Sequence, residues 1–532
     1  MKKIIYPVIL LVLMVHVSCS LFQPSSPKHI FMITLDTTRG DIINFSLNDN
    51  KLTPNLATLA SQGIHFENAY SLIPITLPSH YSMLYSLPPH TLKIYNNGQN
   101  RNVPHPSLAQ LMKKKGYQTG AVVSLGVLKQ DFGLNRGFDR YMENFKPFIW
   151  YKVAEEVNRD AFELIDQFKD DKSFIWLHYS DPHEPYYPPY FDGAFQLTVN
   201  GREVYQCKSI EQPAATINIE LQPGENIVEF KTEIPKEFNK TKDISVGFIT
   251  FQNFTYQTKD NVEVKIPEEW KKVEVRGDKI NYFSQKELSR MVVLNKEKTN
   301  ASINLSFLYR MLERPQSRRF LYRKQVQYMD RQIGKLIDRL KEKGMYDDSL
   351  FVIMGDHGEG MGEYKRHYGH IHYLNKIYTH VPLIVAGGAL KKRGAQSRLA
   401  SNLDIAPTIL DAAAIQQPEF MKGHSLLKDG APHSLILETY APEAYFDAFS
   451  IIDYPHQIIF YPGREKEKVE FINLEEDKYG IHNTFKTTKA QKEKTNLYNN
   501  ILKVSRIFIS QKGKIGKISE QHRKMLESLG YL

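Results

Sequence analysis

Cysteine is nearly absent from this chain, and long hydrophobic runs are missing after its amino terminus. Only Cys19 and Cys207 occur among 532 residues, which excludes a small fold held together by several disulfides. After residue 18 the sequence contains no run of the roughly 20 apolar residues that a membrane-spanning helix requires. It also contains no internal repeat and no low-complexity tract, so it is neither a repeat array nor a flexible linker protein.

A strong charge of one sign is missing as well. The formal net charge is +10 and is spread along the chain, which is too little to indicate a nucleic-acid-binding protein. A modest positive charge suits anionic partners such as esters, phospholipids or glycans. With 42% hydrophobic and 24% charged residues the chain is globular. Its length allows one large α/β domain with an insertion, or two to four smaller domains.

The amino terminus carries a secretion signal. Two lysines precede an apolar run (residues 4–15) that is too short to span a bilayer, and the small residue Ser18 stands directly before Cys19. This arrangement resembles a bacterial lipoprotein signal, with residues 1–18 removed, Cys19 lipidated, and residues 19–28 forming a polar tether. We therefore predict an extracytoplasmic protein that is lipid-anchored to a bacterial membrane, in the periplasm or at the cell surface. An uncleaved anchor or an ordinary signal peptide is the alternative.

Four apolar runs rich in β-formers predict buried strands of a parallel sheet. Three of them end in polar residues that could carry chemistry, namely Asp36, the Asp181–His183 segment, and the pair Asp356 and His357. The runs span residues 29–35, 173–180, 349–354 and 381–386. Because ligands bind outside the carboxyl ends of such strands, these side chains are expected at one sheet edge.

Helices alternate with these strands, which predicts a mostly parallel sheet covered on both faces. Thr53 and Pro54 open one helix that Gly63 closes, and a longer helix is expected over residues 319–343. Residues 191–304 break the rhythm, because they alternate apolar with polar residues around Asn-Gly and Pro-Gly turns. They predict a small antiparallel β-sandwich inserted into the α/β domain.

This pattern divides the chain into a catalytic domain in two parts, an insertion and a smaller α+β end. The first catalytic part covers residues 29–190 and the second covers residues 305–433. The insertion lies between them, at residues 191–304. A carboxyl-terminal subdomain is expected over residues 434–532.

Four motifs occur in order along the chain: TLDTTRGD (34–41), TLPSHYSM (76–83), HYSDPHEPYYPP (178–189) and GDHGEGMGEY (355–364). Together with segments such as TPNLATLASQGIHFENAYS and DIAPTILDAA, they closely resemble the sulfatase branch of the alkaline phosphatase superfamily. The resemblance runs nearly end to end. It implies an alkaline-phosphatase-like sheet sandwiched by helices, one divalent metal ion, a nucleophile at the start of a helix, and cleavage of sulfate or phosphate esters.

The resemblance also implies a ligand set for the metal, which would be Ca, Mg, Mn or Zn. Its members are Asp36, Thr76, Asp356 and His357, with Thr76 as the reacting group. Thr76 falls where sulfatases carry the cysteine that becomes formylglycine. Oxidation of a threonine alcohol gives a ketone, so no formylglycine is expected, and a threonine alkoxide is the predicted nucleophile.

Further site residues follow from the same resemblance. His80 replaces the arginine of the family and could donate to an oxyanion, while His183 and His370 match histidines that contact the substrate or protonate its leaving group. Asn97 is expected to touch the substrate. Pro78 suits a first helical turn, and the backbone N–H groups after it are expected to face the transferring group.

Besides Thr76 and His80, the sequence departs from typical sulfatases in two places. Leu92 and Lys93 stand near the position where relatives usually have His-Gly. Residues 120–128 read GAVVSLGVL where many relatives carry a lysine and a histidine. The preferred interpretation is a metal-dependent hydrolase of sulfate or phosphate esters with a covalent intermediate on Thr76, acting on an anionic glycan or lipid headgroup and not on nucleic acid. Two alternatives remain: a transferase that moves a phosphoryl-linked headgroup, and a binding protein that keeps the fold without turnover.

Overall fold

The computed structural model describes residues 26–48, 50–145, 150–184, 186, 195–206, 215–232, 249–257, 261–268, 271–275, 279–284, 288–311, 315–390, 393–430, 434–440, 446–466, 468–512 and 524–525. The predicted signal, Cys19 and Cys207 lie outside these residues, so the lipid anchor stays a prediction. Among the described helices, none combines the length and the apolar character needed to cross a membrane.

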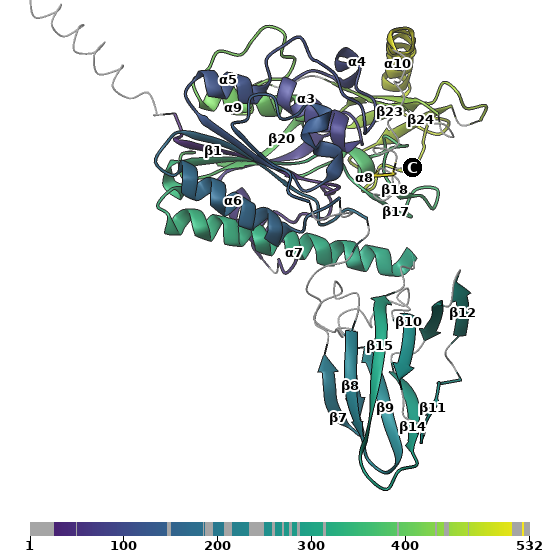
Figure 1. Ribbon diagram of the computed structural model, residues 1–532. Coiled ribbons are helices and arrows are strands. Elements are labelled where there is room, and N and C mark those ends of the chain that lie inside the picture. Colours follow the sequence, from purple (N-terminus) through teal and green to yellow (C-terminus); the bar gives the residue numbers. More distant parts are fainter. Residues whose placement is uncertain are drawn as a thin grey trace, which may run out of the picture.

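An eight-stranded sheet forms the centre of the molecule, in the order β20-β2-β19-β16-β1-β5-β3-β4 (Figure 1). Its strands are β1 (His29–Leu35), β2 (Ile64–Tyr70), β3 (Gln118–Val122), β4 (Arg140–Met142), β5 (Ser173–Tyr179), β16 (Ser349–Gly355), β19 (Leu383–Ala386) and β20 (Gly394–Ser401). All neighbouring pairs are parallel except the two that involve β19. The predicted mostly parallel sheet is therefore confirmed, as are the strands that begin at residues 29, 173 and 349.

The direction of β19 corrects the sequence interpretation, which took residues 381–386 as another parallel strand. The chain leaves β16 at Gly355, and the Gly355 N–H donates to the Pro382 carbonyl at 3.0 Å. The intervening segment thus returns to the same edge of the sheet without crossing it. β19 starts where β16 ends and must run antiparallel to it.

Helices cover both faces of the sheet, which explains why β1 is a continuous apolar run. Successive side chains point to opposite faces, so Ile30 and Met32 join one core cluster while Phe31 and Ile33 join the other. One face is covered by α2 (Pro54–Gln62), α6 (Ala154–Phe168) and α7 (Pro315–Glu342), and the other by α3 (Thr76–Tyr85), α5 (Leu108–Lys114) and α9 (Ile405–Ala412). Figure 1 shows these layers on either side of the strands.

The two predicted helices are present. α2 has Thr53 as its N-cap, a proline in its first turn and Gly63 as its C-cap. α7 begins four residues earlier than predicted and ends one residue earlier. Its predicted apolar stripe is buried in the core: Val326, Met329, Ile333, Leu336, Ile337 and Leu340.

The inserted segment forms two five-stranded antiparallel sheets with a hydrophobic core of their own. The strands are β6 (Phe195–Val199), β7 (Arg202–Gln206), β8 (Ala215–Leu221), β9 (Gly224–Thr232), β10 (Ile249–Gln257), β11 (Val262–Lys265), β12 (Lys271–Val275), β13 (Lys279–Ser284), β14 (Leu288–Asn295) and β15 (Ala301–Met311). The last strand continues past the predicted boundary at residue 304, because its pairing with β10 extends to the couple Ile249 and Met311.

A four-stranded antiparallel sheet follows the catalytic part. Its strands are β21 (Leu435–Thr439), β22 (Ala448–Asp453), β23 (His456–Phe460) and β24 (Val469–Asn473), and α10 (Gln491–Gln511) packs on it through Leu497 and Ile501. Further short elements include α4 (Pro89–Leu92), α8 (Lys376–Thr379), β17 (Gly360–Met361) and β18 (Tyr368–Gly369). The last two form a small hairpin shortly after Asp356.

Candidate active site

Two carboxylates meet at the carboxyl edge of the central sheet. β1 and β16 are parallel neighbours with Leu35 opposite Gly355, so the residues that follow them, Asp36 and Asp356, lie at the same level. Both side chains are fully buried. Asp356 Oδ1 accepts the Thr37 N–H at 3.0 Å and the His357 N–H at 2.7 Å, while its Oδ2 has no hydrogen-bond partner within the described residues.

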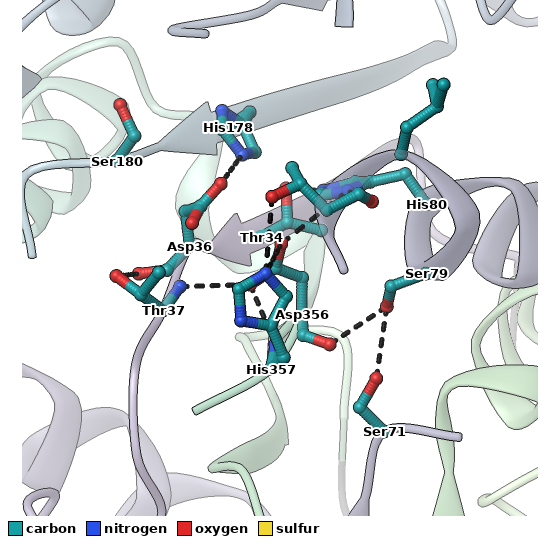
Figure 2. Close-up of polar contacts among 12 residues, drawn as sticks. Thr34, Asp36, Thr37, Ser71, Ser79, His80, His178, Ser180, Asp356 and His357 are labelled. Carbon is teal, nitrogen blue, oxygen red and sulfur yellow. Dashed lines mark hydrogen bonds and ion pairs between the residues drawn. The ribbon is translucent and has the colours of Figure 1, made fainter. Parts of the chain in front are cut away.

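The third component is the start of α3. Thr76 is the first helical residue rather than the cap, which is Ile75. The Thr76 hydroxyl oxygen lies 3.2 Å from His357 Nε2. The first turn of α3 is also bonded to the residue that follows β16, because Ser79 Oγ donates to the Asp356 carbonyl at 2.9 Å (Figure 2). The helix therefore delivers a hydroxyl to the two carboxylates.

The backbone N–H groups at this helix start differ from the sequence prediction. The Leu77 N–H donates to Asn97 Oδ1 at 2.9 Å, Pro78 has no N–H, and the Ser79 N–H donates to the Ile75 carbonyl at 3.1 Å. These groups are used by the protein itself. The field of the helix terminus still favours negative charge near Thr76, but the predicted row of N–H groups facing the transferring group is wrong.

His357 presents a lone pair to the hydroxyl and the carboxylates. Its Nδ1 lies 3.0 Å from the Gly358 carbonyl. Since a carbonyl can only accept, Nδ1 carries the proton and Nε2 is left with a lone pair. One ligand atom from each of Asp36, Asp356 and His357 can be chosen so that the three lie within 4.8 Å of one another. Hard carboxylate oxygens with one imidazole suit a divalent cation, so these residues fit the predicted metal.

A second buried group, formed by His80, His178 and Asp356, has similar spacing. The positions of the protons on its two histidines do not suit a cation. His80 Nδ1 lies 2.7 Å from the Thr76 carbonyl, so this nitrogen is an N–H donor. His178 Nδ1 accepts from the Ser124 N–H at 3.4 Å, so its proton lies on Nε2, which faces Asp36 Oδ2 at 3.1 Å. Neither nitrogen that faces a carboxylate offers a lone pair to a cation.

Burial dominates the electrostatics of the two carboxylates. It raises the pKa of Asp36 to about 6, against the opposing effects of His183, His370 and a hydrogen bond from Thr76. Burial, followed by the charge of Asp36, also raises the pKa of Asp356 above its ordinary value. Asp36 Oδ1 has no hydrogen-bond partner among the described residues. Two buried carboxylates in this condition are stabilised in their ionised form by a cation.

The other predicted histidines lie beside this group. The rings of His183 and His370 are 5.5 Å apart, and that of His370 is 4.4 Å from His357. His183 Nδ1 donates to the Glu184 carbonyl at 2.6 Å. Burial lowers the pKa of both imidazoles, that of His370 to about 4. The structure thus brings together all the residues that the sequence placed in the site.

Sequence reasoning missed two residues. His178 contacts Asp36 directly, although it was seen only as the first letter of its motif. Its signal is a histidine inside an apolar strand, in register with Thr34 of β1. Glu359, which lies in the GDHGEGMGEY motif, is buried with Oε2 3.3 Å from His370 Nδ1.

Glu359 should make the metal-free protein sensitive to alkali. Burial raises the pKa of Glu359 from 4.5 to about 8. In the unfolded chain Glu359 therefore loses its proton at a lower pH than in the folded protein, and the free energy of unfolding falls as pH rises between these two values. Without metal, we expect Glu359→Gln to gain on the order of a few kcal/mol over the wild type from about pH 5 to about pH 8. Urea unfolding of both proteins across this range measures it. A constant difference at every pH would refute the buried charge.

Arg39 connects the segment after β1 to the loop that follows Asp356 through ion pairs. Its guanidinium binds both oxygens of Asp41, at 2.8 and 2.9 Å, and Glu363 Oε1 at 2.8 Å. Arg39→Met would remove the guanidinium from both carboxylates, and Glu363 would keep only the Met361 N–H and the more distant Arg319. We therefore expect a loss of about 3–5 kcal/mol in unfolding free energy. Chemical denaturation checks this, and Lys335→Met, on the exposed surface of α7, serves as a control with little effect.

The chain is similar to known proteins in sequence and in fold. The family model described as Sulfatase matches residues 28–415, and one described as N-sulphoglucosamine sulphohydrolase, C-terminal, matches residues 368–506. An N-acetylglucosamine-6-O-sulfatase from Bacteroides thetaiotaomicron is 23% identical over 428 residues, covering 76% of this chain and 71% of the relative.

Solved structures share the fold. A protein in complex with its substrate D-glucosamine-2-N,6-O-disulfate superposes with a TM-score of 0.58 at 14% identity, over 91% of this chain and 99% of the other. A phosphonate monoester hydrolase from Silicibacter pomeroyi superposes with a TM-score of 0.56 at 16% identity, over 93% and 98%. These likenesses confirm the predicted fold class.

Proposed function

Because the chain belongs to the sulfatase family of ester hydrolases, we propose that it cleaves sulfate or phosphate esters through a covalent intermediate on Thr76. The observation that carries this proposal is the position of the Thr76 hydroxyl, 3.2 Å from the lone pair of His357 and beside the buried carboxylates of Asp36 and Asp356. A purely structural role of the hydroxyl would not explain why two buried carboxylates without a counter-charge lie beside it.

Each step can be assigned to groups of this chain. When bound by Asp36, Asp356, His357 and Thr76, a divalent cation supplies positive charge that favours an ionised alcohol. Thr76 loses its proton to water and its oxygen attacks sulfur or phosphorus, while the bond to the leaving oxygen breaks. His183 or His370 takes up the proton that Thr76 gave to water and donates it to that oxygen. Water then attacks the Thr76 ester, restores the hydroxyl and releases the inorganic anion.

Asn97 is suited to hold the substrate. Its Oδ1 accepts the Leu77 N–H, and its Nδ2 is buried without a hydrogen-bond partner in the described part of the chain. Because Asn97 is bonded to the residue after Thr76, its Nδ2–H group is held near the nucleophile. It can donate a hydrogen bond to a non-bridging oxygen of the ester.

His80 is better placed to position Thr76 than to touch the substrate. Its Nδ1 donates to the Thr76 carbonyl, and its Nε2 lies 3.1 Å from the Thr34 hydroxyl, which also accepts from Trp176. With both ring nitrogens engaged, His80 has no proton to offer an oxyanion. Its catalytic role, predicted from the position of the family's arginine, stays a prediction that these bonds do not favour.

The substrate class we propose is an anionic ester of a glycan, because curated relatives and solved neighbours carry names of sulfated sugars. Thr76 itself favours phosphate esters, since it cannot become the formylglycine of typical sulfatases. We also propose attachment to a bacterial membrane through lipidated Cys19, on the signal-like residues 1–18. Metabolic labelling with palmitate would test the anchor, with Cys19→Ala as control.

A three-substrate screen tests the reaction. The Mn²⁺-loaded protein is assayed on 4-nitrophenyl sulfate, 4-nitrophenyl phosphate and a 4-nitrophenyl phosphodiester, each with Thr76→Ala beside it. Turnover of any ester that the variant lacks supports the proposal and identifies sulfur or phosphorus. Turnover that survives in the variant contradicts it. Metal binding with no turnover would favour a binding protein, and glycerol-dependent turnover would favour a transferase.

A further inference from the structure

We propose that His178 is a positioning residue that aims Asp36 at the cation. In this role its ring holds one carboxylate oxygen, so that the other points to the metal. The inference rests on the proposed cation site, and it assigns a function to a histidine that the reaction scheme above does not use.

The backbone fixes His178 and Asp36 side by side. β5 is the parallel neighbour of β1, and His178 stands opposite Thr34. The pairing continues one residue beyond β1, because the Asp36 N–H donates to the Tyr179 carbonyl at 2.8 Å. Both side chains are completely buried, so neither can turn out to water. Figure 2 shows the His178 ring pointing at the Asp36 carboxylate.

Ser124 sets the orientation of the proton on His178. The Ser124 N–H lies 3.4 Å and its hydroxyl 2.7 Å from His178 Nδ1. Because a backbone N–H can only donate, Nδ1 accepts and Nε2 carries the proton. That proton is donated to Asp36 Oδ2 at 3.1 Å. Ser124 is itself anchored, since its carbonyl accepts the Lys152 N–H at 2.9 Å.

This chain of bonds decides how Asp36 can bind a cation. Because Oδ2 accepts an N–H group, Oδ1 is the oxygen left without a hydrogen bond in the described part of the chain, and rotation of the carboxylate is restricted. Groups that orient a metal ligand in this way typically contribute 10–100-fold to affinity.

Calorimetric titration of the metal-free full-length protein with Mn²⁺ tests the inference. His178→Leu fills similar space without a donor, and we expect it to weaken affinity roughly 10–100-fold. His178→Gln keeps an N–H donor within reach of Asp36 and should remain within about threefold of the wild type. Equal losses in both variants would show that the ring matters for packing alone and would overturn the inference, as would unchanged affinity in His178→Leu.

A double variant separates positioning from ligation. If His178 acts through Asp36, then His178→Leu should cost little further affinity once Asp36→Asn is present. If His178 were itself a ligand, the two losses would multiply, and the inference would fail. Should His178→Leu not fold, His178→Met replaces it, because methionine also lacks an N–H donor: weakened Mn²⁺ binding is expected, and wild-type affinity would contradict the proposal. Failure of the wild type to bind Mn²⁺ would instead refute the proposed cation site.

Discussion

Thr76→Ala is expected to lower kcat on the accepted ester by a factor on the order of 10³ or more, because it removes the nucleophile. The fold should be unaffected, since the Thr76 side chain does not cap α3. Steady-state kinetics of the metal-loaded protein measure the loss, and thermal melting verifies the fold.

Thr76→Ser is the matched control for this variant. It keeps a hydroxyl at the first helical position and should retain measurable turnover, whereas alanine retains none above background. If alanine and serine variants turned over at the same rate, another group would have to form the covalent bond.

Asp356→Asn is expected to abolish the stabilisation that a divalent cation gives to the wild type. The amide oxygen can still accept the N–H groups of Thr37 and His357, which now bind Oδ1. The amide nitrogen replaces Oδ2 and turns N–H groups, not a lone pair, toward the cation. Affinity should therefore fall by at least about 100-fold while the local hydrogen bonds survive.

The metal-free variant should behave in the opposite sense. Burial raises the pKa of Asp356 in the folded protein. Ionisation of Asp356 therefore destabilises the metal-free fold, and the free energy of unfolding falls as pH rises above the pKa of the unfolded chain. Asparagine has no such cost, and the metal-free variant should melt above the metal-free wild type at about pH 8. Scanning calorimetry of both proteins with and without Mn²⁺ gives the stabilisation by metal and the melting temperatures of the metal-free forms. A variant with the wild-type response to metal would remove Asp356 from the site.

Much of this site follows from the sequence, because β1 and β16 are apolar runs that end in acids. Once the two strands are parallel neighbours, Asp36 and Asp356 must meet at one edge. The direction of β19 could not be read in this way. A buried strand has the same apolar pattern in either direction, and only the path of the preceding loop decides which one it takes.

Protonation states were also beyond the sequence. Whether a histidine offers a lone pair or a proton depends on the partner of its second nitrogen, and that partner is set by the folded geometry. His357 accepts because Nδ1 donates to Gly358, whereas His178 donates because Nδ1 accepts from Ser124. The same holds for the start of α3, where Asn97 takes an N–H group that the helix alone would leave exposed to a ligand.

The most direct test is an anomalous-scattering crystal structure of the Mn²⁺-loaded protein. The account predicts one manganese peak in contact with Asp36 Oδ1, Asp356 Oδ2 and His357 Nε2, with the Thr76 hydroxyl in the same coordination sphere. A peak held by His80 and His178, or one beyond reach of Thr76, would contradict it.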